Sequence, residues 1–219
     1  MTAKNLSLFH IIRPSRSNLK NPPLLLMLHG YGSNEEDLFS FASELPDKFF
    51  IISVRAPFPL EPYGNAWYAI YFDAEKGKFN NVQQANEAVE LVSNFIDEAI
   101  SAYNLNDKNV TLLGFSQGAI LSYGISLSYP EKVKNCIALS GYIDRDILPE
   151  DLTKNNYSQL DFYCSHGTAD QVIPIEWARK SKPFLDNLKI KNIFSEFPVG
   201  HGVAPQNFFE MKSWLEQRL

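Results

Sequence analysis

Residues 114–118 read Gly-Phe-Ser-Gln-Gly and place one serine between two glycines in a G-x-S-x-G pattern. A serine hydroxyl is a weak nucleophile near neutral pH, so a catalytic serine must be accessible, close to a base and close to donors for the oxyanion. An apolar run at 110–113 precedes the pattern and a helical pattern follows it, which is typical of a tight strand-to-helix turn that presents the serine. We therefore predict Ser116 as a nucleophile. The alternative is a glycine-lined turn in which Ser116 only caps the helix.

His201 lies in the sequence Val-Gly-His-Gly at residues 199–202, after a strand pattern and before the last helical pattern. Its small neighbours leave the imidazole free to reach across the strand ends. Imidazole has an ordinary pKa that suits a general base near neutral pH, so we predict His201 as the base for Ser116. The alternative is a surface or internally bonded histidine. His10, inside a strand pattern, is expected to be a packing residue.

A histidine base of this kind needs a carboxylate that fixes its tautomer and stabilises the imidazolium. Asp170 follows a strand pattern that ends near Ser165, and it completes the chain order Ser, Asp, His. The alternative for Asp170 is a turn residue that caps the next helix. Three other aspartates lie in a long loop or ahead of a strand and fit less well: Asp144, Asp146 and Asp161. His166 and Asp170 could also hold a metal, but no third ligand stands at a suitable spacing, so we expect none.

The oxyanion formed on an attacked carbonyl needs backbone N–H donors. One predicted donor is the amide of Gln117 in the first turn of a helix, where the helix dipole adds partial positive charge. The second is the amide of Tyr31 in the glycine-rich loop 29–33. Because only the N–H is required, Gln117→Ala is expected to keep turnover within roughly tenfold of wild type. His29 is expected beside the substrate pocket or as a packing residue.

Strand and helix patterns alternate along the 219 residues. Short apolar runs, suited to strands buried on both faces, cover residues 6–12 (at an edge), 24–29, 49–54, 110–115, 133–139, 162–164 and 193–197. Apolar residues at steps of three and four predict a packing helix over 82–103, with a coiled coil as the weaker alternative. Shorter helices are predicted over 35–44 with Asn34 as N-cap, 117–128, 175–188 and 205–218.

This alternation implies parallel strands joined by right-handed crossovers, and hence a three-layer α/β architecture with ligands at the carboxyl ends of the strands. Segments 56–81 and 141–159 are longer than plain connections, so we predict that they form walls of a pocket. We expect one domain over residues 1–219, with a mostly parallel central sheet and no large cap domain.

Composition and the absence of certain sequence features argue against several other classes of protein. Twenty basic residues against 25 acidic ones give a net charge of −5, and without a run of Lys or Arg this argues against nucleic-acid binding. Cys136 and Cys164 form no C-x-x-C pair and are expected to be buried thiols. Neither a signal-peptide core nor a membrane-spanning apolar stretch is present, so we expect a cytoplasmic protein without membrane insertion. The sequence predicts no particular oligomeric state.

Six ordered motifs resemble those of the carboxylesterase, lysophospholipase and acyl-protein thioesterase family of small α/β-hydrolases. They are Leu-His-Gly-Tyr-Gly at 28–32, Arg-Ala-Pro at 55–57, Ala-Trp-Tyr at 66–68, Gly-Phe-Ser-Gln-Gly-Ala at 114–119, His-Gly-Thr-Ala-Asp at 166–170 and Gly-His-Gly at 200–202. The resemblance covers most of the chain and implies an α/β-hydrolase fold that cleaves carboxylic esters or thioesters without a cofactor. It also implies that Trp67 lies near the acyl pocket.

We therefore expect a serine esterase that cleaves esters of short to medium acyl chains through Ser116, Asp170, His201 and an acyl-enzyme. A related alternative is an acyl-protein thioesterase or lysophospholipase acting on long acyl chains, which would need a long apolar channel. A more distant alternative is a ligand-binding protein that has the fold without catalysis. The expected partner is a small acyl ester or thioester.

Overall fold

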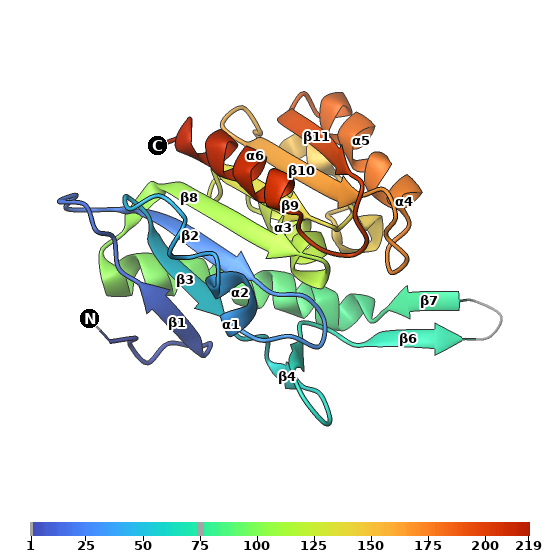
Figure 1. Ribbon diagram of the computed structural model, residues 1–219, viewed down its shortest axis with the longest axis horizontal. Helices are drawn as coiled ribbons and strands as arrows, with labels where there is room; N and C mark the ends of the chain where they lie inside the picture. Colours follow the sequence, from blue (N-terminus) through green and yellow to red (C-terminus); the bar gives the residue numbers. More distant parts are fainter. Residues whose placement is uncertain (1, 74–76) are drawn as a thin grey trace.

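A seven-stranded sheet with helices on both faces forms the centre of the molecule (Figure 1). The structure is a computed structural model that describes residues 2–73 and 77–219. The strands of the sheet are β1 (His10–Arg13), β2 (Pro23–Leu28), β3 (Phe50–Val54), β8 (Asn106–Phe115), β9 (Asn135–Leu139), β10 (Asp161–Gly167) and β11 (Lys191–Phe197). Their order is β1-β3-β2-β8-β9-β10-β11. Only the edge strand β1 is antiparallel to its neighbour in this sheet, so the prediction of a mostly parallel α/β architecture is confirmed.

The described helices are α1 (Glu36–Phe39), α2 (Val82–Tyr103), α3 (Gln117–Ser128), α4 (Ile175–Arg179), α5 (Ser181–Asn187) and α6 (Pro205–Glu216), with the 3-10 turns η1 (Arg145–Ile147) and η2 (Leu152–Lys154). Both α2 and α3 have the predicted bounds. The side chain of Asn81 accepts a hydrogen bond from the Gln84 N–H and caps the start of α2. Asn104 ends the helix in the left-handed conformation, at φ 55°.

The predicted helix 35–44 is wrong in length and in its cap. Only the single turn α1 is helical, and Glu35 rather than Asn34 occupies the N-cap position. The side chain of Asn34 accepts a hydrogen bond from the Glu36 N–H. Beyond α1 the chain continues in tighter turns, in which Ala42 N–H donates to the Phe39 carbonyl three residues earlier.

The predicted helix 175–188 is divided into two, α4 and α5. Pro183 lies in the first turn of α5, where it has no N–H to donate to the carbonyl of residue 179. Its ring also crowds that carbonyl, so one continuous helix through this region is disfavoured. The last helix, α6, ends at Glu216, two residues before the predicted end.

The two faces of the sheet carry separate hydrophobic clusters, and this explains why its inner strands are apolar at successive positions. Leu24, Leu26 and Leu28 of β2 belong to the cluster that includes side chains of α2 and α3. Leu25 and Met27, which point the opposite way, belong to the cluster that includes side chains of α1 and α6. A strand covered on both sides must bury every side chain, so no polar alternation is seen in β2.

The long segment 56–81 forms two hairpins rather than an irregular loop. β4 (Phe58–Pro59) pairs with β5 (Asn65–Ala66), and β6 (Ile70–Asp73) pairs with β7 (Gly77–Asn80). Figure 1 shows β6 and β7 projecting from the end of the sheet near the start of α2. The other long segment, 141–159, carries η1 and η2.

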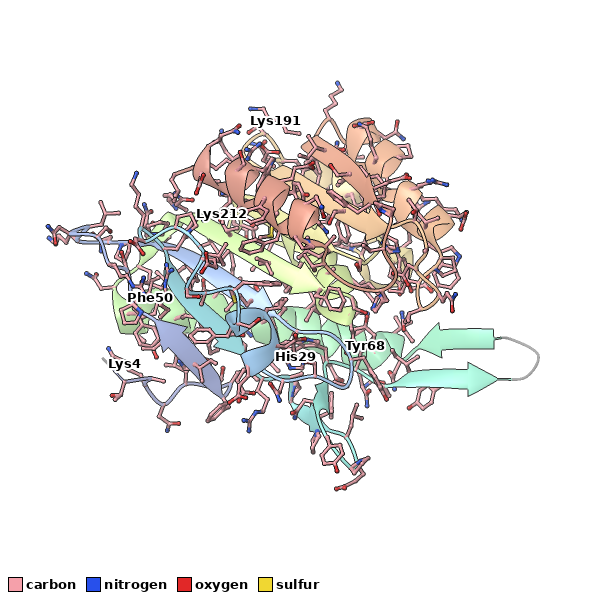
Figure 2. The ribbon with its side chains drawn as sticks, in the orientation of Figure 1. Lys4, His29, Phe50, Tyr68, Lys191 and Lys212 are labelled. Atoms are coloured by element: carbon pink, nitrogen blue, oxygen red, sulfur yellow. The ribbon has the colours of Figure 1, made fainter. Side chains whose placement is uncertain are left out.

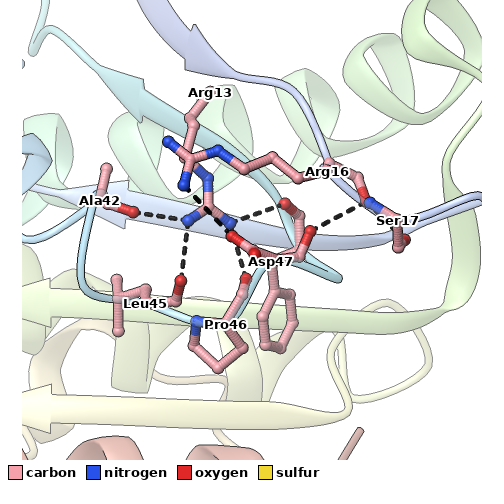
Figure 3. A network of polar contacts seen from close by, with 9 residues as sticks. Arg13, Arg16, Ser17, Ala42, Leu45, Pro46 and Asp47 are labelled. Carbon is pink, nitrogen blue, oxygen red and sulfur yellow. Dashed lines mark hydrogen bonds and ion pairs between the residues drawn. The ribbon is translucent and has the colours of Figure 1, made fainter.

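A buried arginine fixes the end of the edge strand β1 (Figure 3). Arg13 is only 7% exposed, and its guanidinium donates to four backbone carbonyls between strands. The acceptors are the carbonyl oxygens of Ala42 (2.6 Å), Leu45 (2.8 Å), Pro46 (2.7 Å) and Phe49 (3.0 Å). Burial lowers the pKa of this guanidinium. Arg13 therefore supplies donors to carbonyls of the turns between α1 and β3 that no strand neighbour satisfies.

Three minor predictions concern single side chains and membrane segments. Cys136 and Cys164 are buried free thiols in β9 and β10, as expected. His10 is a buried residue of β1 whose Nδ1 donates to the Leu8 carbonyl (2.9 Å), so it is a packing residue. Among the residues that the structure describes, no helix has the length and apolar character needed to cross a membrane.

Candidate active site

Ser116 occupies a sharp turn between β8 and α3, at the carboxyl end of a central strand. Its φ of 54° is unusual for a residue with a side chain and indicates local backbone strain. The two flanking glycines allow this turn because their neighbours are too close for a side chain. A Cβ on Gly118 would overlap the Leu28 carbonyl oxygen, and a Cβ on Gly114 would overlap the Gly118 carbonyl oxygen. The G-x-S-x-G pattern therefore has the structural context that the sequence predicts.

His201 and Asp170 reach Ser116 from the loops after β11 and β10. Ser116 Oγ lies 2.9 Å from His201 Nε2, and His201 Nδ1 lies 2.7 Å from Asp170 Oδ2. A carboxylate only accepts, so Nδ1 carries the proton and donates it to Asp170. Nε2 of the neutral ring is then the acceptor for the serine hydroxyl. The structure thus brings together the three residues that the sequence predicted to meet.

The Asp170 carboxylate is buried, yet it is held as an anion. Its Oδ1 accepts the N–H groups of Val172 (2.8 Å) and Ile173 (3.0 Å), in addition to the His201 bond on Oδ2. Burial by itself would raise the pKa of Asp170, but these hydrogen bonds outweigh burial and lower that pKa. Asp170 therefore remains ionised and able to hold a protonated imidazole.

His166 is a second histidine at this carboxylate that the sequence analysis considered only as a metal ligand. It is 1% exposed, and its Nε2 donates to the Ile173 carbonyl (2.9 Å) and lies 3.2 Å from Asp170 Oδ2. No cluster of three or more His, Cys, Asp or Glu side chains suited to a metal occurs in the described residues. The spacing of four residues between His166 and Asp170 was the available signal for this contact.

Ser116 and His201 open onto a cavity of about 280 Å³. Both long segments contribute to its wall, as predicted: the first gives Tyr68, Ile70 and Asn80, and the second gives Tyr142. Tyr31 and Gln117 line the same cavity, together with Ile120, Val172 and Ile173. The site is therefore a small, mostly apolar pocket with a few polar side chains.

The loop that carries Tyr31 is fixed by its neighbours. Gly32 N–H donates to the Asn65 carbonyl (2.9 Å), and Ser33 N–H donates to the Gly30 carbonyl (3.3 Å). Neither bond uses the N–H of Tyr31. The N–H of Gln117 is the first of α3, and N–H groups of a first helical turn have no acceptor within the helix. Tyr31 and Gln117, the two residues predicted to supply the oxyanion donors, thus line the same cavity as Ser116.

The side chain of Gln117 has a role that sequence analysis missed. Its Oε1 accepts the Trp67 N–H (2.9 Å) and its Nε2 donates to the Tyr68 carbonyl (2.8 Å), in a position where Gln117 is 2% exposed. The carboxamide therefore holds the backbone of the pocket wall to the start of α3. No local pattern could reveal this contact, because it joins residues about 50 positions apart.

Trp67 and His29 are not among the described residues that line the cavity. His29 fits the packing alternative, and Trp67 lies behind the cavity wall, where its backbone N–H bonds to Gln117. Both are completely buried, and Trp67 Nε1 donates to the His29 carbonyl (2.9 Å). His29 Nδ1 donates to the Gly30 carbonyl (2.7 Å), and its Nε2 accepts the Ala56 N–H (3.0 Å). Burial lowers the pKa of His29, which fits a neutral ring with one donor and one acceptor. Figure 2 labels His29 within the body of the molecule and Tyr68 where β6 begins. The neighbouring Tyr68 lines the pocket instead.

Comparison with known proteins identifies the family. The model of the phospholipase/carboxylesterase family matches residues 10–219. The chain therefore belongs to the phospholipase/carboxylesterase family, whose α/β-hydrolase fold its sheet and helices share.

Individual relatives agree with this assignment. Carboxylesterase SOBER1 of Arabidopsis thaliana is 29% identical over 89% of this chain and 90% of its own length. Acyl-protein thioesterase 1 of Kluyveromyces lactis is 26% identical over 90% of this chain and 92% of its own length. Among solved structures, esterase PE8 superposes with a TM-score of 0.85 at 26% identity, over 98% of this chain and 100% of that one. The resemblance inferred from the six motifs is thus confirmed, as is the general class of carboxylic ester hydrolase.

Proposed function

We propose that the chain hydrolyses carboxylic esters with Ser116 as nucleophile, His201 as general base and Asp170 as the residue that orients His201. One observation carries the proposal: the continuous hydrogen bonds from Asp170 through His201 to Ser116 Oγ. As Oγ attacks the carbonyl carbon, His201 Nε2 accepts its proton and then gives it to the leaving alcohol. Water then attacks the acyl-enzyme, with His201 again accepting the proton of the nucleophile and returning it to Ser116 Oγ, and the acid is released.

The oxyanion of each tetrahedral intermediate accepts hydrogen bonds from the backbone N–H groups of Gln117 and Tyr31. The N–H of Gln117 adds the partial positive charge of the start of α3. The position of both residues on the cavity wall beside Ser116 supports this assignment. Neither donor needs a particular side chain for charge stabilisation.

The preferred acyl chains are short to medium. A cavity of about 280 Å³ is at the small end of ligand pockets, which hold roughly 300–1,000 Å³. Each buried methylene contributes about 0.8 kcal/mol, so kcat/KM should rise about fourfold per methylene until the cavity is full. A series of esters and thioesters from acetyl to palmitoyl measures this directly, and we expect a plateau at medium length. A rise that continues to palmitoyl would contradict it.

A long-chain thioesterase or lysophospholipase is the second candidate. The relatives named acyl-protein thioesterase 1 favour it, and it would use the same three residues. The volume of the cavity favours the shorter acyl groups. In the acyl series, the long-chain candidate predicts its highest kcat/KM with palmitoyl thioesters.

Replacement of Ser116 and Asp170 tests the catalytic assignment. Ser116→Ala should lower turnover by at least about 10⁴ and abolish labelling by a fluorophosphonate, because the nucleophile is gone. Asp170→Asn should lower turnover by roughly 10⁴ through loss of the correct histidine tautomer. Asp161→Asn, at the far end of β10, is the control and should leave turnover at the wild-type level. Wild-type protein that is folded but never labelled would favour the non-catalytic ligand-binding alternative.

A further inference from the structure

The backbone of residues 30–33 forms a tight turn that packs against the nucleophile. Ser33 N–H donates to the Gly30 carbonyl (3.3 Å), and Gly32 has a φ of 78°. A positive φ at the third residue of such a turn is typical of type II and favours glycine there. A Cβ on Gly30 would lie 3.3 Å from the Cβ of Ser116, so the first residue of the turn is in close contact with the nucleophile.

The Tyr31 N–H is a free donor of this turn. The Ser33 N–H closes the turn, and the Gly32 N–H donates to the Asn65 carbonyl (2.9 Å). The Tyr31 N–H donates to no acceptor among the described residues. It belongs to the peptide that follows Gly30, the residue in contact with the nucleophile. The direction of this donor therefore depends on how the turn is held.

The hairpin of β4 and β5 holds the turn from the other side. Asn65 N–H donates to the Ser33 carbonyl (2.7 Å), in addition to the bond that the Asn65 carbonyl accepts from Gly32. Ser33 and Asn65 thus form a β-bridge between the turn and the hairpin. Figure 1 labels β4 in a hairpin that projects away from the central sheet. The residues that follow Tyr31 are therefore fixed by backbone bonds to a separate element.

Gly64 makes this close approach possible. Its φ is 81°, and a Cβ on Gly64 would overlap the Gly32 carbonyl oxygen. Its own carbonyl accepts the Leu60 N–H (2.9 Å), which closes the hairpin. A Cβ on Gly32 would have no atom within 4 Å. The backbone conformation alone therefore explains glycine at position 32, whereas position 64 also needs the space that a side chain would occupy.

We propose that the β4–β5 hairpin positions the Tyr31 N–H for catalysis, and that Gly64 is a positioning residue because its missing side chain lets the hairpin close on the Gly32 carbonyl. This inference rests on the proposed function, in which the Tyr31 N–H stabilises the oxyanion. A donor of this kind accelerates the reaction when it is already aimed at the place where the charge develops. The hairpin supplies that orientation from outside the turn.

Gly64→Ala tests this role in the whole protein. The added methyl group must separate the hairpin from the turn, which breaks the bond between Gly32 and Asn65 and lets the Tyr31 N–H move. We expect kcat to fall about 10²-fold with little change in KM for a short acyl ester, as for the loss of one oxyanion donor or a displacement of about 1 Å. Tyr63→Ala, at the neighbouring position, is 83% exposed in wild type and should retain wild-type kcat. Wild-type kcat in Gly64→Ala would overturn the proposal.

A second variant loosens the hairpin without adding an atom beside Gly32. Leu60→Pro removes the N–H that donates to the Gly64 carbonyl. The hairpin pairs with no strand of the central sheet, so the sheet should remain folded. We expect kcat to fall about tenfold with little change in KM. Tyr157→Phe, which loses a bond to the Leu127 carbonyl, measures the effect of reduced stability alone and should retain wild-type kcat. Wild-type kcat in Leu60→Pro would contradict support by the hairpin.

Nuclear magnetic resonance of the Tyr31 amide gives a readout that a purely structural role would not change. The probe is a trifluoromethyl ketone with a short alkyl chain: Ser116 Oγ bonds to its carbonyl carbon, the carbonyl π electrons become the oxyanion, and His201 takes the hydroxyl proton. In wild type, the amide protons of Tyr31 and Gln117 should both move downfield as they donate to this oxyanion. In Gly64→Ala, the amide proton of Gln117 should still move and that of Tyr31 should not. Equal shifts of the Tyr31 proton in both proteins, or loss of both shifts in the variant, would overturn the proposal.

Failure of the proposed function gives a different result. Wild type would then form no adduct with the ketone, and neither amide proton would move. If the adduct forms in wild type without a shift of the Tyr31 amide proton, Tyr31 is not an oxyanion donor and Gly64 has no positioning role.

Discussion

At the scale of single residues, the loop after β10 is organised around one carboxylate. Ile173 contributes twice: its N–H donates to Asp170 Oδ1, and its carbonyl accepts from His166 Nε2. His166 thus fixes the loop that orients Asp170, and it does so from a buried position in β10. We regard His166 as a positioning residue, because it does not touch Ser116 or line the cavity.

His166→Leu should therefore lower kcat by about 10²-fold with little change in KM. Loss of the Nε2 donor releases the Ile173 carbonyl and lets Asp170 move, and a displacement of about 1 Å in a catalytic group has an effect of this size. His166→Gln can still donate to that carbonyl and should recover most of the lost kcat. Steady-state kinetics of the two variants measure this effect. Equal losses in both variants, or a change confined to KM, would contradict the positioning role.

At the scale of elements, the start of α3 and the wall segment 65–70 are joined through one side chain. The Gln117 carboxamide satisfies a buried N–H and a buried carbonyl of that segment. The sequence-based expectation that Gln117→Ala is nearly neutral considered only the oxyanion. That expectation therefore needs revision, because Gln117→Ala also removes hydrogen bonds that affect the stability of the protein and the shape of the pocket.

Gln117→Ala should destabilise the protein by about 2 kcal/mol or more, because each buried polar group left unpaired costs about 1–3 kcal/mol. Turnover should fall by more than tenfold as the wall that carries Tyr68 loosens. Gln117→Glu is the matched variant, since it keeps an acceptor for Trp67 but loses the donor to Tyr68. Urea unfolding and kcat of both variants test this. Wild-type stability in Gln117→Ala would show that the two bonds are dispensable.

The edge strand β1 is fixed to the neighbouring turns by an arginine rather than by a further strand. Arg13→Met should lower the free energy of unfolding by about 3 kcal/mol, because three buried carbonyls and one partly buried carbonyl lose a charged donor. Arg13→Lys should recover little, since an ammonium cannot reproduce the planar fork. The control is Arg16→Gln, which removes only an exposed ion pair with Asp47 and should cost less than about 1 kcal/mol. Urea unfolding distinguishes these outcomes.

At the scale of the whole molecule, stability should decrease in alkaline solution because two thiols are buried between the sheet and its helices. Burial raises the pKa of Cys164 from 9.0 to about 12, and it also raises the pKa of Cys136. The unfolded chain loses these protons near pH 9, whereas the folded chain retains them. The stabilisation is therefore complete below about pH 9 and decreases as the pH rises toward 12, by up to about 1.4 kcal/mol per pH unit for each thiol.

Cys164→Ala should make this decrease shallower by about one proton. Measurement of the free energy of unfolding against pH, for wild type and variant, gives the two slopes. Cys164 also raises the pKa of the neighbouring Tyr123, so both proteins are compared in a Tyr123→Phe background, where the difference between the slopes reports the thiol. Identical slopes between about pH 9 and 11 would show that the Cys164 thiol ionises as readily in the folded protein as in the unfolded chain.

Much of the architecture and the main polar constellation were predictable from local signals. Apolar runs typical of strands buried on both faces are sufficient to predict the parallel sheet. Apolar residues at helical spacing are sufficient to predict α2 and α3. Ser116, Asp170 and His201 were identifiable because each falls just after a strand pattern, and parallel strands bring their carboxyl ends to one edge. The errors in 35–44 and 175–188 arose where tight turns and Pro183 prevailed over helical spacing.

By itself, the sequence determined the order of strands and helices, the strand-end position of the three polar residues and the family motifs. Only the tertiary structure decided which aromatic residue of the Ala-Trp-Tyr motif meets the cavity, because the Gln117 carboxamide and the His29 carbonyl turn Trp67 into the core and leave Tyr68 on the wall. The hydroxyl of Tyr68, which has no hydrogen-bond partner among the described residues, was equally hidden. Whether a buried polar atom has a hydrogen-bond partner depends on groups from distant segments of the chain, so the spacing of residues along the sequence does not predict it.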